Sequence, residues 1–197
     1  MSRILLLRHG ETDGQSSIRF HGATDVALSP LGRAQMREAA RALPDDGIDL
    51  VVASPLARAW EGARIVRPQA PIVLEADFRE IDFGRWEGLT AEEIEQRDPS
   101  LYRLWREGAP GFEFPEGERR ASFRARVEAG LERMLARRAR SMLVVAHKGV
   151  VRRIVERLCG EAPPESEPAL GGLVQVTLRS DGRWVVGRRS SDPRCGP

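Results

Sequence analysis

The chain has 197 residues, of which 41% are hydrophobic and 30% are charged, proportions that are ordinary for a globular protein. Its 31 basic and 29 acidic residues leave a net charge of +2, which gives no broad electrostatic reason to expect a nucleic-acid partner. No run of about 18 apolar residues predicts a membrane-spanning helix.

The length is that of one domain, and we predict a single domain over residues 1–189 followed by a flexible tail over residues 190–197. The two cysteines, Cys159 and Cys195, belong to no CxxC motif, so the sequence supports neither a disulfide framework nor a zinc site. We therefore expect a reducing, cytoplasmic setting and no bound metal.

The first predicted element is a strand over residues 4–7, where four apolar residues in a row indicate burial on both faces, as in a parallel sheet. Arg8 and His9 end this strand, and Gly10 lets the backbone turn tightly beside them. In an open α/β sheet, ligands bind just beyond the carboxyl ends of the strands. Taken alone, however, the pair is more readily explained as a basic strand end that happens to contain a histidine.

A polar loop over residues 13–28 follows, and a loop of this length in a compact domain is usually functional. Ser29 is placed to cap a helix that begins at Pro30 and ends at the turn-forming residues 44–47. A second strand is predicted over residues 48–53.

A helix is expected after this second strand, capped by Ser54 and Pro55 and carrying apolar residues at helical spacing. Arg58 lies in its first turn, where the positive end of the helix dipole disfavours a cation. An arginine in this position indicates an anion nearby, unless its side chain simply points to solvent.

The middle of the chain alternates short elements with loops. We expect a strand over 72–74, a loop over 78–88, helices over 91–97 and 99–105, an irregular stretch over 108–117, and a long amphipathic helix over 118–138. The 78–88 loop is acidic and aromatic without a clean period, which indicates a functional loop. We interpret the irregular stretch as a mobile flap over the site.

A fourth buried strand is predicted over residues 142–146, and it too ends in a histidine, His147. The helix that follows is closed by Gly160. Residues 173–178 and 184–187 predict a hairpin that lies antiparallel at an edge of the sheet.

Strands that alternate with helices predict an α/β fold with three layers, α/β/α, around a mostly parallel central sheet with an antiparallel C-terminal edge strand. The residues that follow the four parallel strands then meet at one edge of the sheet: Arg8 and His9, Arg58, Glu80, and His147. Chance alone does not explain why residues of these types follow all four parallel strands. Two cations and two imidazoles make a pocket for a dianion, and a phosphoryl group fits it.

These residue types suit phosphoryl transfer. A histidine can attack phosphorus if a hydrogen bond at one ring nitrogen keeps the other nitrogen unprotonated. The leaving alkoxide must gain a proton, and a carboxylic acid can supply it. No metal is required where arginine and histidine provide the positive charge.

Five segments resemble, in order, the motifs of the histidine phosphatase superfamily, which includes the cofactor-dependent phosphoglycerate mutases. The segments are Leu-Leu-Arg-His-Gly-Glu-Thr at 6–12, Arg-Phe-His-Gly-Ala-Thr-Asp at 19–25, Ser-Pro-Leu-Ala-Arg-Ala at 54–59, the acid loop at 80–88 and Ala-His-Lys-Gly at 146–149. The match spans residues 3–160, and it implies a phosphoglycerate mutase-like fold.

The resemblance implies a role for each matched catalytic residue. His9 would take the phosphoryl group as a phosphohistidine, and Arg8, Arg58 and His147 would bind that group and stabilise the transition state. Glu80 would give a proton to the leaving group and then help water to attack the phosphohistidine. No cofactor and no metal are implied.

The predicted substrate-binding residues are Arg8, Gln15, His21, Gly22, Arg58 and Lys148. Gln15 stands where many relatives have Asn, and its amide would reach phosphate from further out. His21 replaces a usual Gln, Ser or Thr, and lining the pocket and facing solvent are both open to it. Lys148 replaces a frequent Gly, so that it either adds charge for the substrate or points outward.

Three further positions bear on the family motif. Arg119 stands where the motif usually has Ser, and a change of specificity is one consequence to expect. Asp82 and Glu87 lie in the acid loop, and we expect them to hold that loop rather than to react.

The short chain and its acid loop look more like the phosphatase branch, including α-ribazole phosphatases and broad-specificity phosphatases, than like the longer mutases. We therefore predict a metal-independent phosphomonoester hydrolase that acts through a phosphohistidine on a small phosphorylated metabolite, as a monomer or homodimer. The alternatives are a cofactor-dependent phosphoglycerate mutase and a phospho-ligand binding protein whose catalysis has lapsed.

Overall fold

The structure, a computed structural model, describes residues 2–44, 47–164 and 168–187. Its elements are β1 (Arg3–Arg8), α1 (Pro30–Ala42), β2 (Leu50–Ala53), α2 (Ala57–Val66), β3 (Ile72–Leu74), the 3₁₀ turns η1 (Ala76–Phe78) and η2 (Gly84–Trp86), α3 (Ala91–Arg97), α4 (Pro99–Arg106), α5 (Arg120–Leu135), β4 (Ser141–Ala146), α6 (Lys148–Cys159), β5 (Leu173–Leu178) and β6 (Trp184–Val186). The tail predicted over residues 190–197 lies outside the described residues.

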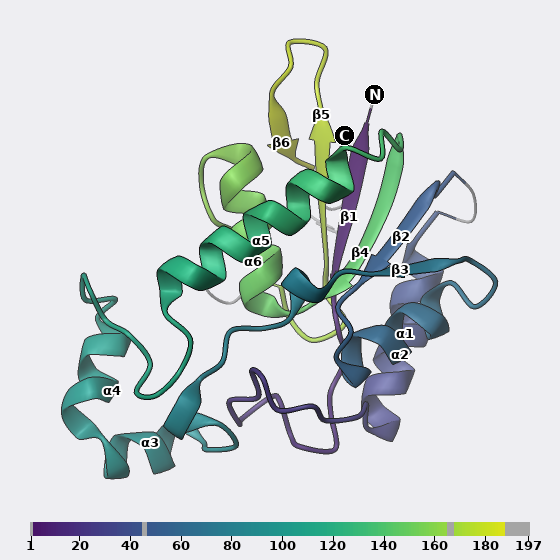
Figure 1. Cartoon of the computed structure of the whole chain (residues 1–197). Helices are drawn as coiled ribbons and strands as arrows, with labels where there is room; N and C mark the ends of the chain where they lie inside the picture. Colours follow the sequence, from purple (N-terminus) through teal and green to yellow (C-terminus); the bar gives the residue numbers. More distant parts are fainter. Residues whose placement is uncertain (1, 45–46, 165–167, 188–197) are drawn as a thin grey trace, which may run out of the picture.

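The strands form one mixed sheet in the order β3-β2-β4-β1-β5-β6 (Figure 1). The first four of these strands are parallel to one another, and Leu5 of β1 pairs with Leu143 of β4. The C-terminal hairpin extends the sheet, because β5 pairs antiparallel with β1 and β6 pairs antiparallel with β5. The predicted α/β fold with an antiparallel C-terminal edge is confirmed.

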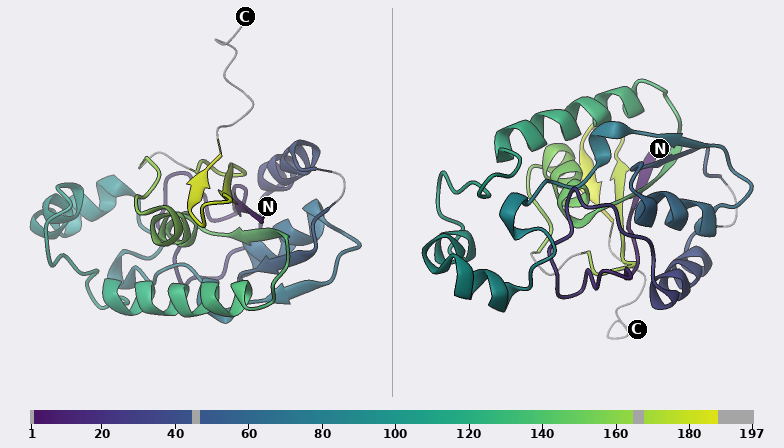
Figure 2. Two further views of the ribbon diagram at one scale, coloured as in Figure 1. Left: turned by 90° about the horizontal axis from the view of Figure 1, so that it is seen from above. Right: turned by 60° about the horizontal axis from the view of Figure 1, so that its bottom comes forward.

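Alternate residues of the central strands face opposite layers of helices. Ile4 and Leu6 are buried in the core that α5 and α6 cover, whereas Leu5 and Leu7 are buried in the core that α1 and α2 cover. Figure 2 shows the two pairs of helices on opposite sides of the sheet. A strand covered on both faces must be apolar at every position, which is why β1 and β4 carry unbroken apolar runs.

Helices α3 and α4 stand apart from the sheet and are held by an aromatic cluster (Figure 1). The buried members of the cluster are Trp86, Ile94, Tyr102 and Phe112. The indole N–H of Trp86 donates to Asp98 Oδ2 at 2.9 Å, so the polar atom of this buried ring has a partner. The cluster fixes the segment after β3, and the partly buried rings packed against it, Phe20, Phe83, Trp105 and Phe114, line the pocket of the site.

Several predicted helix ends are confirmed by their hydrogen bonds. The Ser29 hydroxyl accepts from Gly32 N at 3.0 Å at the start of α1. Thr90 and Glu93 form a reciprocal capping box at the start of α3. Gly160 ends α6 with a φ of +89°, which a residue with a side chain rarely adopts.

The start of α2 corrects the sequence prediction. The helix begins at Ala57 rather than after a Ser54 cap, and the Ala57 N–H donates instead to Asp25 Oδ1 at 2.7 Å. The cap therefore comes from the 13–28 loop, because Leu56 is still in an extended conformation. The Ser54 hydroxyl accepts from Leu56 N at 3.3 Å and also contacts His147, at 2.8 Å from its Nε2.

Other boundaries also differ from the prediction, most of them by one residue, and α5 ends at Leu135 rather than at residue 138, where Arg138 has a φ of +55°. β2 begins at Leu50 rather than at residue 48, because the Asp49 carboxylate accepts from the N–H groups of Arg140 and Ser141 just before the ladder. α5 begins at Arg120 rather than at 118, because the backbone N–H of Glu118 donates to Asp82 O at 2.9 Å.

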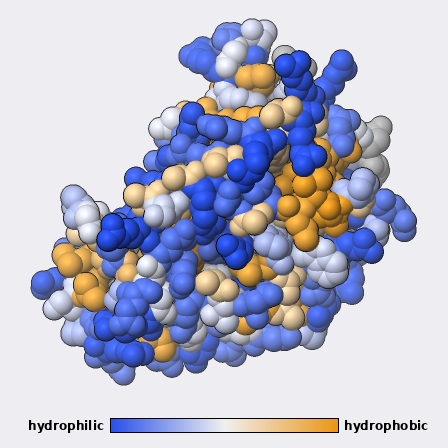
Figure 3. Space-filling model, in the orientation of Figure 1, coloured by the Kyte–Doolittle hydropathy of each residue, from blue (hydrophilic) through white to orange (hydrophobic). Residues whose placement is uncertain are grey.

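Hydrophilic residues cover most of the face seen in Figure 3, and an apolar patch lies beside the C-terminal end of α5 over β2 and β4. Within the described ranges, none of the helices combines the length and the apolar character that crossing a membrane requires.

Candidate active site

The carboxyl ends of β1, β2 and β4 lie together, and each delivers residues of the predicted site. Arg8 and His9 end β1, and the backbone N–H of His9 bonds to Ala146 O at the end of β4. His147 follows that same strand, and its ring centroid lies 5.2 Å from that of His9. Glu80 reaches the site through the η1 turn after β3. The expected convergence at one edge of the sheet is therefore present in the structure.

His9 is buried, and its hydrogen bonding fixes one tautomer. Nδ1 lies 2.7 Å from the Gly10 carbonyl, which can only accept, so Nδ1 must carry the proton. Nε2 then keeps its lone pair. Burial, and then the positive charges of Arg58 and Arg8, hold the pKa of His9 well below its usual value of 6.5, so the ring is neutral at physiological pH. The ring has the electronic state of a nucleophile.

Arg58 is completely buried, and backbone carbonyls aim its guanidinium. Nη1 donates to Thr24 O at 2.8 Å, and Nη2 donates to His21 O at 3.1 Å and to Gly22 O at 2.7 Å. Burial lowers the pKa of Arg58, and the neighbouring carboxylates, Glu80 first among them, oppose that effect. An arginine titrates so far above neutral pH that it remains a cation here. The guanidinium is therefore a fixed positive charge beside His9.

His147 is the second buried imidazole of the site. Its Nε2 lies 2.8 Å from the Ser54 hydroxyl, a partner that the sequence had suggested as a helix cap. Burial, followed by the charges of Arg58 and His9, keeps the pKa of His147 well below 6.5. Ser54 follows the neighbouring strand β2 and orients the His147 ring from there. The signal that could have identified Ser54 as a site residue is its polar side chain at the end of a buried strand.

Nitrogen atoms without partners meet around His9. Within the described ranges His21 Nδ1 has no partner, but His21 Nε2 lies 2.6 Å from the Gly14 carbonyl, which can only accept, so Nδ1 carries a lone pair rather than a proton for an anion. Among the described residues of this site, the buried atoms Arg8 Nε, Arg58 Nε and His147 Nδ1 also have no hydrogen-bond partner. Buried polar atoms are nearly always hydrogen-bonded, so a group of orphans needs an explanation. An oxyanion with several acceptor oxygens would satisfy them together, which fits a phosphoryl group.

The Glu80 carboxylate is oriented by two backbone N–H groups. Ile81 N donates to Oε1 at 3.0 Å and Gly149 N donates to Oε2 at 2.9 Å. Gly149 also leaves the room that the carboxylate occupies, since a Cβ at that position would lie 2.4 Å from Glu80 Oε1. The sequence predicts a turn at Gly149 but gives no sign of this contact.

Arg126 of α5 holds the chain that leads to Glu80. Its guanidinium donates to the carbonyls of Asp77, Arg79 and Glu80 at 2.8, 2.6 and 3.0 Å. Both Glu118 oxygens accept from the same guanidinium at 2.7 Å. Arg126 is one of many arginines in an amphipathic helix, so nothing in the local sequence indicates that it positions Glu80.

The acid loop is tied to the 13–28 loop by Glu87, as predicted. The carboxylate oxygens of Glu87 accept from the N–H groups of Gly22, Ala23 and Thr24, at 3.0 to 3.2 Å, and from Phe83 N at 2.9 Å. Asp82 Oδ1 accepts from Gly84 N at 2.7 Å. Both carboxylates are thus engaged in holding loops.

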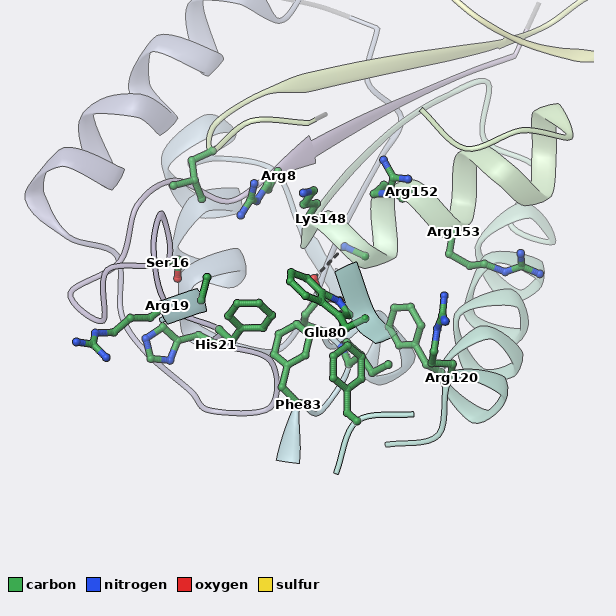
Figure 4. Close-up of a pocket in the computed structure, with 18 of the residues that line it drawn as sticks. Arg8, Ser16, Arg19, His21, Glu80, Phe83, Arg120, Lys148, Arg152 and Arg153 are labelled. Atoms are coloured by element: carbon green, nitrogen blue, oxygen red, sulfur yellow. Dashed lines mark hydrogen bonds between the residues drawn. The ribbon is translucent and has the colours of Figure 1, made fainter. Parts of the chain in front are cut away.

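The predicted substrate-binding residues divide into two groups. His21 and Lys148 line a pocket above the catalytic residues, together with Arg8, His9 and Glu80. Figure 4 shows Arg8, Lys148 and Glu80 around one space, with His21 on one side of it.

Gln15, Gly22 and Arg58 do not line this pocket, and Arg58 is completely buried beneath it. Gln15 is exposed and has a φ of +60°, and its neighbour Ser16 lines the pocket instead. Gly22 is buried, a Cβ there would lie 1.8 Å from Ile81 O, and its own carbonyl holds Arg58. Arg119 is exposed, occupies the N-cap position of α5 without a side-chain capping hydrogen bond, and does not line the pocket. A role for Gln15 in binding phosphate stays a prediction.

Across the part of the chain that the structure describes, no three or more His, Cys, Asp or Glu side chains are grouped so that they could hold a metal ion. The site's positive charge comes from Arg8, Arg58 and the surrounding basic residues.

Comparison with known proteins decides the family. The model of the histidine phosphatase superfamily, branch 1, matches residues 4–189. The chain belongs to this superfamily. The resemblance inferred from the five sequence segments is therefore confirmed.

Relatives within the histidine phosphatase superfamily are named as phosphatases. Glucosyl-3-phosphoglycerate phosphatase from Mycobacterium tuberculosis is 32% identical, over 94% of this chain and 87% of that protein. Phosphoserine phosphatase 1 from Hydrogenobacter thermophilus is 31% identical, over 81% of this chain and 77% of that protein. The crystal structure of the α-ribazole phosphatase from Shigella flexneri superposes with a TM-score of 0.80 at 28% identity and covers 94% of each chain.

Proposed function

We propose that this chain is a metal-independent phosphomonoester hydrolase that works through a phosphohistidine on His9. The observation that carries the proposal is the state of the His9 ring. Its Nδ1 proton is committed to the Gly10 carbonyl, which leaves the Nε2 lone pair beside a group of buried nitrogens without partners among the described residues. The neutral imidazole of His9 lies next to N–H donors that have no partner of their own within the described ranges. This arrangement suits attack on a phosphate dianion.

In the first step His9 Nε2 forms a bond to phosphorus, and the bond from phosphorus to the ester oxygen breaks. Arg8, Arg58 and His147 bind the three equatorial oxygens and stabilise the charge that they carry in the transition state. Glu80, in its protonated form, gives its proton to the departing oxygen, so the leaving group departs as an alcohol.

In the second step water replaces the histidine. Glu80, now a carboxylate, accepts a proton from water as the water oxygen attacks phosphorus and the bond to His9 Nε2 breaks. Inorganic phosphate leaves, and the proton that Glu80 gave in the first step has been replaced by the one taken from water. No metal is needed in either step, because Arg8 and Arg58 supply fixed positive charge.

The relatives support this class of reaction. Proteins similar to the chain over most of its length are named glucosyl-3-phosphoglycerate phosphatase, phosphoserine phosphatase and α-ribazole phosphatase, so the proposed substrate is a small phosphorylated metabolite. We place the reaction in the cytoplasm, since two cysteines without a disulfide framework fit a reducing compartment. A monomer or homodimer stays a prediction.

The test is release of inorganic phosphate from a panel of phosphate monoesters, with a metal chelator present. The panel includes α-ribazole phosphate, phosphoserine, 3-phosphoglycerate and an aryl phosphate. The proposal predicts chelator-resistant release by the wild type and a loss of at least about 10³-fold in His9→Ala. Unchanged release by His9→Ala would exclude the proposed nucleophile. Isomerisation of 3-phosphoglycerate that exceeds hydrolysis and depends on 2,3-bisphosphoglycerate would instead identify a mutase.

A further inference from the structure

The pocket above His9 is much larger than a phosphoryl group requires, and its wall is strongly cationic. Its volume is about 1250 Å³, and eight basic but only three acidic side chains line it. The phosphoryl group accounts for the cations at the inner end, where Arg8 lies beside His9. The basic residues further out need a separate explanation.

Some of these outer cations are neutralised within the protein. Arg153 pairs with Glu128 and with Glu156, and Arg19 pairs with Glu93 at 2.9 Å. Local carboxylates therefore satisfy these two guanidinium groups, and they are not available to bind a substrate.

Arg120 and Arg124 of α5, unlike Arg153 and Arg19, have no carboxylate of the described residues in direct contact with their guanidinium groups. Their guanidinium groups form no hydrogen bond or close ion pair with any residue in the described ranges 2–44, 47–164 and 168–187, although both side chains line the pocket. Arg124 interacts with Glu128 through space only, without a direct contact. Residues four apart share one face of a helix, so the two like charges repel each other. In Figure 4, Arg120 lies at the opposite end of the pocket from His21. An anion placed between the two guanidinium groups would relieve that repulsion.

A wall of aromatic rings also lines this pocket. The rings are those of Phe20, Phe83, Trp105, Phe114 and Phe123. Edge-to-face contacts hold several of them, with centroids 5.2 Å apart for Phe20 and Phe83 and 4.9 Å apart for Phe83 and Phe114. Preorganised aromatic surface of this kind packs well against a flat ring.

We infer that the substrate's leaving group is a ring that carries a second anionic group, a carboxylate or a second phosphate, which Arg120 and Arg124 bind while the aromatic wall contacts the ring. This inference rests on the proposed function, because it names the substrate class for the same site. A charge-assisted hydrogen bond to guanidinium is stronger than a neutral one, so the second anion should raise kcat/KM by about tenfold.

The test compares esters that differ only in the second anion. One pair is 4-carboxyphenyl phosphate and phenyl phosphate, and the other is fructose 1,6-bisphosphate and fructose 6-phosphate. The wild type should show a kcat/KM about tenfold higher for the doubly anionic member of at least one pair, and the responding pair tells a carboxylate from a phosphate. The ratio should fall as ionic strength rises, since salt screens exposed charges.

The variant that decides the question is Arg120→Gln/Arg124→Gln, which should bring the ratio within each responding pair close to one. Arg119→Gln is the matched control, because Arg119 is exposed, lies next to Arg120 and does not line the pocket. It removes the same kind of charge and should leave the ratio unchanged.

Two results would overturn the inference while the proposed function stands: equal kcat/KM values within both pairs, or a ratio that survives in the double variant. If no ester releases phosphate, the proposed function fails instead. In that case calorimetric binding of the same pairs to the wild type separates the two ideas. Affinity about tenfold higher for the doubly anionic members supports the anion site, and equal affinity rejects it.

Discussion

The backbone N–H of Gly149 donates a 2.9 Å hydrogen bond to Glu80 Oε2. This contact joins the first turn of α6, which follows His147, to the loop after β3, so the second histidine and the proposed acid are positioned by one short segment of chain. The space for the carboxylate exists because residue 149 has no side chain, since a Cβ there would lie 2.4 Å from Glu80 Oε1.

Gly149→Ala should therefore impair catalysis without unfolding the protein. The new methyl group would displace the Glu80 carboxylate, and losing a positioned general acid costs about 10²–10⁴ in rate. We expect kcat to fall by about 100-fold, with a melting temperature within a few degrees of wild type because alanine favours the helix more than glycine does.

Steady-state kinetics and a thermal melt check this prediction. Gly187→Ala is the matched control, because a Cβ there approaches its nearest neighbour, the flexible Gln175 side chain, no closer than 3.4 Å. A Gly149→Ala enzyme with wild-type kcat would contradict the account of how Glu80 is positioned.

Arg126 should act as a positioning residue for Glu80. Arg126→Lys keeps the positive charge but cannot reach three carbonyls and the Glu118 carboxylate together, because lysine lacks the planar fork of donors. We expect kcat to fall by about tenfold or more while KM changes less, and the free energy of unfolding to fall by about 2 kcal/mol through the lost hydrogen bonds.

Kinetics with an aryl phosphate and urea denaturation measure both effects for Arg126. Glu118→Gln is the companion variant, because it keeps one acceptor for the guanidinium and should show a smaller loss of kcat. A variant that loses stability with full kcat would leave Arg126 a purely structural role.

The stability of the protein should fall as the pH drops below about 6.5. His9 and His147 have pKa values well below 6.5 in the folded state, mainly through burial and then through Arg58, whereas in the unfolded chain they titrate near 6.5. Below that pH the unfolded state binds more protons, so the free energy of unfolding falls by up to about 1.4 kcal/mol per pH unit for each histidine. Well above pH 6.5 both rings are neutral in both states, and this contribution is constant.

Urea denaturation at pH 7.5, 6.5 and 5.5 measures this dependence. Carboxylates also contribute at low pH, so the comparison is with His9→Gln/His147→Gln, in which the slope between pH 6.5 and 5.5 should be smaller. Equal slopes for the two proteins would show that the buried histidines are not the source.

The layered fold could be predicted because its strands are buried on both faces. The unbroken apolar run of β4, like that of β1, favours a strand covered by helices on both sides, and its short length and flanking residues decide against a helix. The main site residues could be predicted for the same reason, since the carboxyl ends of parallel strands share one edge. His9 and His147, 138 positions apart in the sequence, have ring centroids 5.2 Å apart.

The details that escaped prediction depend on contacts between distant residues. Ser54 looked like a helix cap because it precedes a proline, but the cap is Asp25, which only the folded loop brings to Ala57. The exposed position of Gln15 and its φ of +60° are likewise set by the folded loop, and its role in binding phosphate stays a prediction. Neither effect is encoded in the local pattern of residues.

The most direct test of the central claim is to trap the phosphohistidine. The enzyme is mixed with an aryl phosphate, quenched in alkali within milliseconds, and examined by intact mass and peptide mapping. The account predicts a phosphoryl adduct on His9 that is stable in base and labile in acid, that accumulates in Glu80→Gln, where loss of the proposed base slows attack by water, and that is absent from His9→Ala. An active enzyme with no adduct on His9, or with the adduct on another residue, would contradict it.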